Sequence, residues 1–138
     1  MEQSPLLIPL IVVGALVFMI GFWMGIVWLL AALSGWRSLA THYATTEPSP
    51  SNAQGFIYGM VGWISYNGVL KIAFTEWGLY IGINPLFKIG HPSLLIPYQH
   101  FTNFRQGIFY RKADVQGVTV SLPVRIMEQI QQRVKHGI

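Results

Sequence analysis

Apolar residues fill the first quarter of the chain and then give way to alternating patterns. From Gln3 to Trp36 there are 34 residues without Asp, Glu, Lys or Arg, and the stretch from Leu6 to Leu33 is almost wholly apolar. A helix rises about 1.5 Å per residue and the hydrocarbon core of a bilayer is about 30 Å thick, so about 20 apolar residues suffice to cross it. The 24 residues from Leu10 to Leu33 therefore predict a membrane-spanning helix.

A cleavable signal peptide is the alternative for such a segment. It would begin with positive charge and have an apolar core of only about 7–15 residues before a small-residue cleavage site. This chain begins Met-Glu-Gln-Ser and its apolar run is far longer, although Ala31, Ala32 and Ser34 would permit cleavage. We therefore expect an uncleaved anchor.

A short helix and a linker are predicted after the anchor. Trp36, Leu39 and Tyr43 recur at helical spacing, so a helix over these residues would place them on one face. Residues 45–55 contain two Pro and no bulky apolar side chain, which is typical of a linker. The expected organisation is an anchor at 1–36, a juxtamembrane segment and linker at 37–55, and one domain at 56–138.

From Phe56 onward apolar residues alternate with polar ones, which is the period of β-strands. Phe56 to Tyr66 is predicted to be the first strand and Asn67-Gly68 its hairpin turn, because both residues accept the positive φ angles of a type I′ turn. Further strands are expected at 70–74, 79–83, 85–89, 94–98, one or two within 101–112, and 118–122. Apolar residues then recur at helical spacing and predict an amphipathic helix from Pro123 to about Lys135.

Three segments of this domain resemble the small bacterial PH-like and GRAM-like members of the pleckstrin-homology superfold. They are VLKIAFTEWGLYIGI (69–83), GHPSLLIPYQHF (90–101) and LPVRIMEQIQQRV (122–134). The resemblance implies an antiparallel β-barrel or sandwich of about seven strands, closed by the C-terminal amphipathic helix. The expected fold class is therefore one N-terminal transmembrane α-helix plus a small α+β domain, a layout that resembles single-span bacterial membrane proteins.

The distribution of charge predicts an orientation, because Lys and Arg near a span are held on the cytoplasmic side. Arg37 directly follows the apolar segment, whereas the N-terminal tail carries only Glu2. We expect a single-pass protein of the inner (cytoplasmic) membrane, with its N-terminus outside and its domain in the cytoplasm. Trp36, Arg37 and Tyr43 are the expected anchors at the membrane–water interface.

Positive charge also raises the question of lipid binding. After the anchor there are nine Lys or Arg against four acids, a net charge of +5, which would draw the domain towards an anionic leaflet. The candidate lipid contacts are Lys88, Arg105, Arg111 and Lys112. The alternative is that these residues only fix topology, because they form no dense cluster. Their scatter also argues against nucleic-acid binding.

Glycines within the apolar segment suggest a contact with another helix. Gly21 and Gly25 form a GxxxG spacing that lets helices approach closely, and Gly14 lies near the same face. The alternative is that these glycines face lipid. Because the segment contains no ionisable residue, it offers no ion path and no usual ligand for haem.

Candidate chemistry is sparse. The four acids after the anchor lie at least 14 positions apart, the four histidines show no metal-binding spacing, and there is no Cys. We therefore expect no catalytic residue, metal or cofactor. An enzyme would need a cleft that gathers distant polar residues such as His91, His100 and Asp114.

These observations favour a non-enzymatic accessory or scaffold subunit of a larger membrane complex. Its partners would be membrane lipids and other transmembrane subunits, and the aromatic-rich span would suit a respiratory or photosynthetic assembly. The alternative is a membrane-tethered sensor that binds lipid or peptide through its PH-like domain.

Overall fold

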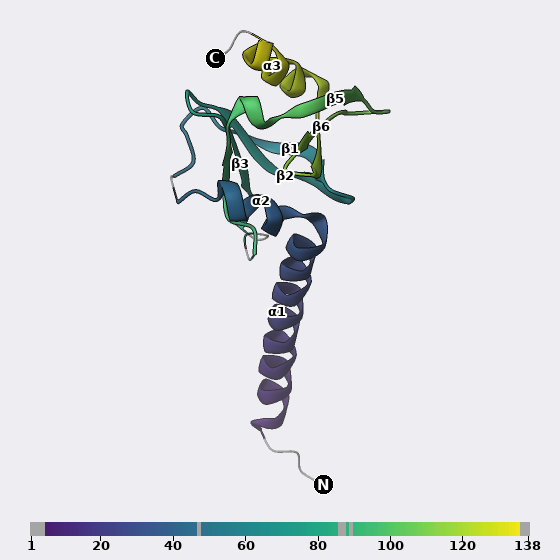
Figure 1. The fold of residues 1–138 in the computed structure, drawn as a ribbon. Helices are drawn as coiled ribbons and strands as arrows, with labels where there is room; N and C mark the ends of the chain where they lie inside the picture. Colours follow the sequence, from purple (N-terminus) through teal and green to yellow (C-terminus); the bar gives the residue numbers. More distant parts are fainter. Residues whose placement is uncertain (1–4, 47, 86–87, 89, 136–138) are drawn as a thin grey trace.

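The computed structural model describes residues 5–46, 48–85, 88 and 90–135. A single long helix, α1 (Leu7–Ser34), leads into a curled sheet that carries a second helix at its far end (Figure 1). The helix is long and apolar enough to cross a membrane. Pro9 is its third residue, where the backbone N–H has no partner within a helix, so α1 begins ahead of this Pro without a break.

The rest of the described chain covers α1 only at its C-terminal end. The residues buried there are Val27, Ala31 and Ser34, which we call the buried stripe. Gly35 then takes a φ of 95°, which ends α1 and redirects the chain into α2 (Trp36–Tyr43). The predicted short helix is confirmed, and it buries the predicted face.

Seven antiparallel strands form one sheet in the order β4-β3-β2-β1-β7-β6-β5. Their bounds are β1 Gln54–Val61, β2 Ile64–Phe74, β3 Leu79–Ile83, β4 Leu94–Ile96, β5 Thr102–Gln106, β6 Arg111–Val115 and β7 Val118–Leu122. The predictions for 79–83 and 118–122 are confirmed, and the strand predicted at 94–98 ends at Ile96, ahead of Pro97. The strand predicted at 85–89 lies largely outside the described residues.

The first hairpin turn lies five residues before the predicted one. Val61 pairs with Ile64, so Gly62 and Trp63 make the turn, and the segment 56–66 is two strands where one was predicted. The positive φ of Gly68, 72°, instead accompanies a change of register inside β2. The prediction of a turn at Asn67-Gly68 was therefore wrong, because the same backbone conformation serves a β-bulge.

The core lies inside the curl of the sheet, and α3 (Val124–Lys135) covers the end of the domain opposite α1 (Figure 1). Ile126, Met127 and Ile130 are the buried residues of α3, so the predicted amphipathic helix is confirmed. Burial of each such side chain contributes about 1.5–3 kcal/mol. At the other end of the core, Trp36 and Leu39 of α2 fill the space between the sheet and α1.

Candidate functional site

The C-terminal end of α1 is joined to the sheet by a buried chain of hydrogen bonds. The hydroxyls of Ser34 and Tyr66 lie 2.9 Å apart, and the Tyr66 hydroxyl lies 2.9 Å from His91 Nε2. Tyr66 belongs to β2 and His91 to the connection between β3 and β4. The chain of hydrogen bonds therefore links three segments that are far apart in the sequence.

Trp36 packs against this series of hydrogen bonds, which therefore lies within the core. Its indole N–H donates to the Pro92 carbonyl at 2.9 Å, and its ring centroid lies 5.4 Å from that of Tyr66 and 5.1 Å from that of His91. Gly90 lets the β3–β4 connection approach α1, because a Cβ there would lie 3.2 Å from Trp28 Cδ1. We call Ser34, Trp36, Tyr66 and His91 the junction.

A second tyrosine–histidine pair fastens α2. The Tyr43 hydroxyl lies 2.7 Å from His100 Nδ1, in the short 3-10 helix η2 (Tyr98–His100). Just beyond, the Thr45 N–H donates to the Ser93 carbonyl at 2.8 Å and Ala44 forms a β-bridge with Leu94. Both α1 and α2 are thus held to the sheet by hydrogen bonds as well as by apolar packing.

The junction is closed to solvent and packs the end of α1 against the sheet. Ser34, Tyr66 and His91 are 2%, 5% and 1% exposed, so a substrate could reach them only if α1 moved. Burial raises the pKa of Tyr66, an effect that its hydrogen bond with Ser34 partly opposes. The phenol therefore stays neutral at physiological pH and keeps its hydrogen bonds.

The predicted interface anchors have different positions. Trp36 and Tyr43 are buried in the protein, so these two rings contact the core and not lipid, contrary to their expected role. Tertiary packing overrides the preference of amphipathic rings for headgroups because the sheet lies directly over α2. Arg37 is exposed, and its guanidinium lies 4.9 Å from the centroid of the Trp28 ring.

The glycines of α1 lie on its open surface. Nothing comes within 4 Å of a Cβ built on Gly14, Gly21 or Gly25, which we call the glycine stripe. With 3.6 residues per turn, this stripe lies roughly 130° around the axis from the buried stripe. Phe18 and Phe22 stack beside it, with ring centroids 6.0 Å apart. The domain therefore leaves the glycine face uncovered.

The candidate lipid-binding cations are divided between two places. Lys88 is exposed in the β3–β4 connection. Its carbonyl accepts from the N–H of His91 at 2.9 Å, and His91 belongs to the junction at the end of α1, so Lys88 lies close to α1. Arg105, Arg111 and Lys112 lie on the β5–β6 hairpin, which Figure 1 shows beside α3 at the end of the domain away from α1. One lipid headgroup could not reach both places.

Both arginines of the β5–β6 hairpin have partners within the protein. Arg105 Nη1 lies 3.1 Å from Asp114 Oδ1, and Arg111 Nη1 donates to Gln131 Oε1 at 2.7 Å. Asp114 also accepts from Asn103 and Thr119 at 2.9 and 3.0 Å. The hydrogen bond from Asn103 is the first cause that holds the pKa of Asp114 below its usual value.

We expect Asp114→Asn to remove a pH-dependent part of the stability. Because the pKa of Asp114 is lower in the folded state, its contribution is complete above the ordinary value of 3.8 and is lost as the pH falls through the folded pKa. The variant should lose at most about 1 kcal/mol at pH 7, since solvent reaches the side chains of both Arg105 and Asp114, and less in acid. Thermal unfolding between pH 7 and pH 3 measures this. Glu76→Gln, at an exposed carboxyl in the β2–β3 turn, is the control, and equal pH profiles for the two variants would contradict the assignment.

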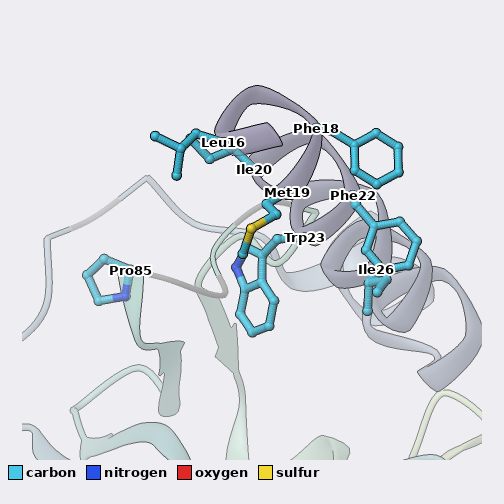
Figure 2. Close-up of a pocket in the computed structure, with 8 residues that line it drawn as sticks. All are labelled: Leu16, Phe18, Met19, Ile20, Phe22, Trp23, Ile26 and Pro85. Carbon is cyan, nitrogen blue, oxygen red and sulfur yellow. The ribbon is translucent and has the colours of Figure 1, made fainter. Parts of the chain in front are cut away.

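An apolar groove runs along α1 below the domain. Figure 2 shows Trp23 between the helix and Pro85 at the end of β3, with Leu16 and Met19 beside it and Phe22 and Ile26 farther round the helix. The groove has a volume of about 660 Å³, and none of its eight lining side chains is titratable. Its surface suits hydrocarbon, either acyl chains or apolar side chains of another helix.

The structure does not bring His91, His100 and Asp114 together. His91 lies in the junction and His100 forms a hydrogen bond with Tyr43. Asp114, on β6, forms an ion pair with Arg105 of β5. Within the described ranges, no three His, Cys, Asp or Glu side chains group so that they could hold a metal ion.

The sequence did not predict the junction, because its members are separated by up to 57 positions. The only available signals were a Tyr in a predicted strand, Tyr66, and a His in a predicted turn, His91. In the comparisons with known proteins, no family model, no curated protein and no solved structure matched this chain.

Proposed function

We propose that this chain is a non-enzymatic accessory or scaffold subunit of a larger membrane complex, possessing one transmembrane helix and a cytoplasmic PH-like domain. The observation that carries the proposal is the uncovered surface of α1. Over its most apolar 18 residues only 6% are buried within the chain. Lipid can cover most of that surface, but the glycine stripe is shaped for the close approach of a second helix.

The layout of the domain supports the PH-like part of the proposal. Seven antiparallel strands in one curled sheet, followed by a C-terminal helix over its end, are what the resemblance implies. PH-like folds serve several functions, so the fold limits the function without choosing it. The choice of a scaffold over a catalyst rests on the buried, closed junction.

The surface of the domain away from α1 carries a second feature that suits a protein partner. Ile108 and Phe109, at the tip of the β5–β6 hairpin, are 91% and 82% exposed. Aromatic side chains such as that of Phe109 are enriched in the cores of protein–protein interfaces. A scaffold of this kind would thus contact its complex within the membrane through α1 and outside it through the hairpin.

Extraction of the native membrane with mild detergent tests the proposal. The chain should co-purify with other transmembrane subunits, and the double variant Gly21→Leu/Gly25→Leu should lose at least about tenfold in the amount recovered, which corresponds to about 1.4 kcal/mol. Leu favours helix over Gly, so the loss cannot come from unfolding of α1.

The control is Ala15→Leu, which adds bulk on α1 about 100° away from Gly14. It should leave the recovered complex intact. A chain that purifies alone would overturn the proposed function, and a double variant that keeps its partners would move the contact away from the glycine stripe.

The alternative function is a membrane-tethered sensor of lipid or peptide. It is favoured by the position of Lys88 near α1, although the other three candidate cations lie at the far end of the domain. If the chain is a sensor, the amount of lipid or peptide that it binds should change when anionic lipid is added to vesicles that hold the full chain. If it is a scaffold, it should keep the same partner proteins with and without anionic lipid.

A further inference from the structure

The length of α1 brings the domain to the membrane surface. A helix of 28 residues is about 42 Å long, whereas about 20 residues cross the hydrocarbon core. The extra residues lie at the C-terminal end, because the buried stripe packs there against the domain. If residues 7–26 cross the bilayer, the last two turns of α1 and the segments that contact them lie at the level of the headgroups.

Three connections of the sheet lie at this level. The β3–β4 connection contacts α1 through Gly90, which lies against Trp28 and Ala31. The β1–β2 turn contacts it through Gly62, which lies against the Ser34 carbonyl, and Val118 after the β6–β7 turn lies against Gly35. Figure 1 shows α3 at the opposite end of the domain. These connections form the underside of the domain.

The exposed side chains of the underside are those that headgroups attract. Trp63, in the β1–β2 turn, is 68% exposed. Arg37 is exposed and lies over the exposed ring of Trp28, and Lys88 is exposed in the β3–β4 connection. Indole rings prefer the headgroup level, and Lys and Arg near it are attracted to anionic lipid. None of the described residues in the three connections is acidic.

We propose that Trp63, Arg37 and Lys88 dock the domain onto the anionic leaflet in which α1 is anchored, so that the sheet stands on the membrane in one fixed orientation. This inference rests on the proposed membrane span of α1. It assigns to Trp63 the anchoring role that the sequence suggested for Trp36, because the sheet buries one ring and exposes the other.

The absence of Cys from the chain permits a direct test by single-cysteine labelling. Trp63→Cys carries an environment-sensitive fluorophore in the full chain, reconstituted into vesicles of phosphatidylcholine and phosphatidylglycerol. The matched control is Trp77→Cys, since Trp77 is 76% exposed in the turn at the other end of β2. Leu16→Cys reports whether α1 lies in the bilayer.

The label at 63 should be quenched by nitroxides attached near the lipid headgroups and protected from iodide in water, and the label at 77 should show the reverse. Equal accessibility of positions 63 and 77 to iodide, with position 16 protected, would overturn the docking surface and leave the span intact. An aqueous label at position 16 would overturn the span itself and, with it, the proposed function.

A charge-neutralising variant tests the two cations. Arg37→Gln/Lys88→Gln should increase iodide quenching at position 63 at least about twofold, towards the value seen in vesicles of phosphatidylcholine alone. Arg125→Gln/Lys135→Gln, which removes two exposed cations of α3, should have no effect. Equal effects of the two double variants would show that overall charge acts, and would overturn the assignment to Arg37 and Lys88.

Discussion

Trp36→Ala should destabilise the domain by about 3–5 kcal/mol, the range for removal of a large aromatic side chain from a core. Trp36 has no exposed surface, and its loss would leave a cavity between α1, β2 and the β3–β4 connection. It would also leave the Pro92 carbonyl without its indole donor. Since a domain has only about 5–15 kcal/mol of stability, much of the folded population would be lost.

Denaturation of the detergent-solubilised chain, followed by circular dichroism, measures this effect. Trp77→Ala is the matched control, because its ring is exposed, and it should change the stability by no more than about 0.5 kcal/mol. Losses of similar size at the two positions would contradict a buried junction. Trp36→Phe should lie between them, because it keeps much of the volume but not the donor.

Gly62→Ala should separate α1 from the β1–β2 turn. Gly62 has a φ of +60°, where a Cβ costs about 1–2 kcal/mol, and this Cβ would collide with the Ser34 carbonyl, which is backbone and cannot turn aside. We expect the free energy of unfolding to fall by clearly more than the roughly 1–2 kcal/mol that the backbone conformation alone would cost. The Tyr66 hydroxyl should also become more accessible to solvent.

Gly117→Ala isolates the collision from the backbone strain. Gly117 has a similar φ of +78°, but nothing lies within 4 Å of a Cβ built on it. Its substitution should therefore show the conformational term alone, about 1–2 kcal/mol. If both variants lose the same stability in chemical denaturation, α1 does not pack on the β1–β2 turn as described.

Local periodicity was sufficient to predict much of the fold. The predicted boundaries of β3, β7 and α3 agree with the structure to within one residue, because alternation or helical spacing runs uninterrupted through each segment. The buried face of α2 was predicted for the same reason. The first hairpin was misplaced because two nearby glycines, Gly62 and Gly68, both take positive φ, and only the pairing of β1 with β2 decides which one makes the turn.

The candidate site could be predicted less well, because it depends on contacts between distant segments. Trp36 was expected among headgroups, but its position was decided by Tyr66 and His91, neither of which is near it in the sequence. Trp63 was part of a predicted strand, and only the turn at Gly62 exposes it. The curl of the sheet places Lys88 near α1 and the other three candidate cations at the far end of the domain. This separation could not be predicted from local sequence patterns.

The two tyrosine–histidine pairs have a mechanical consequence. They fasten α1 and α2 to the sheet at separate points, so the helix and the domain should turn together as one body. A hydrophobic helix adjusts to a thinner or thicker bilayer partly by tilting. Any such tilt of α1 would therefore have to carry the whole domain with it. If the underside is docked through Trp63, Arg37 and Lys88 as proposed, the headgroup contacts would oppose this tilt and hold α1 at one angle to the bilayer.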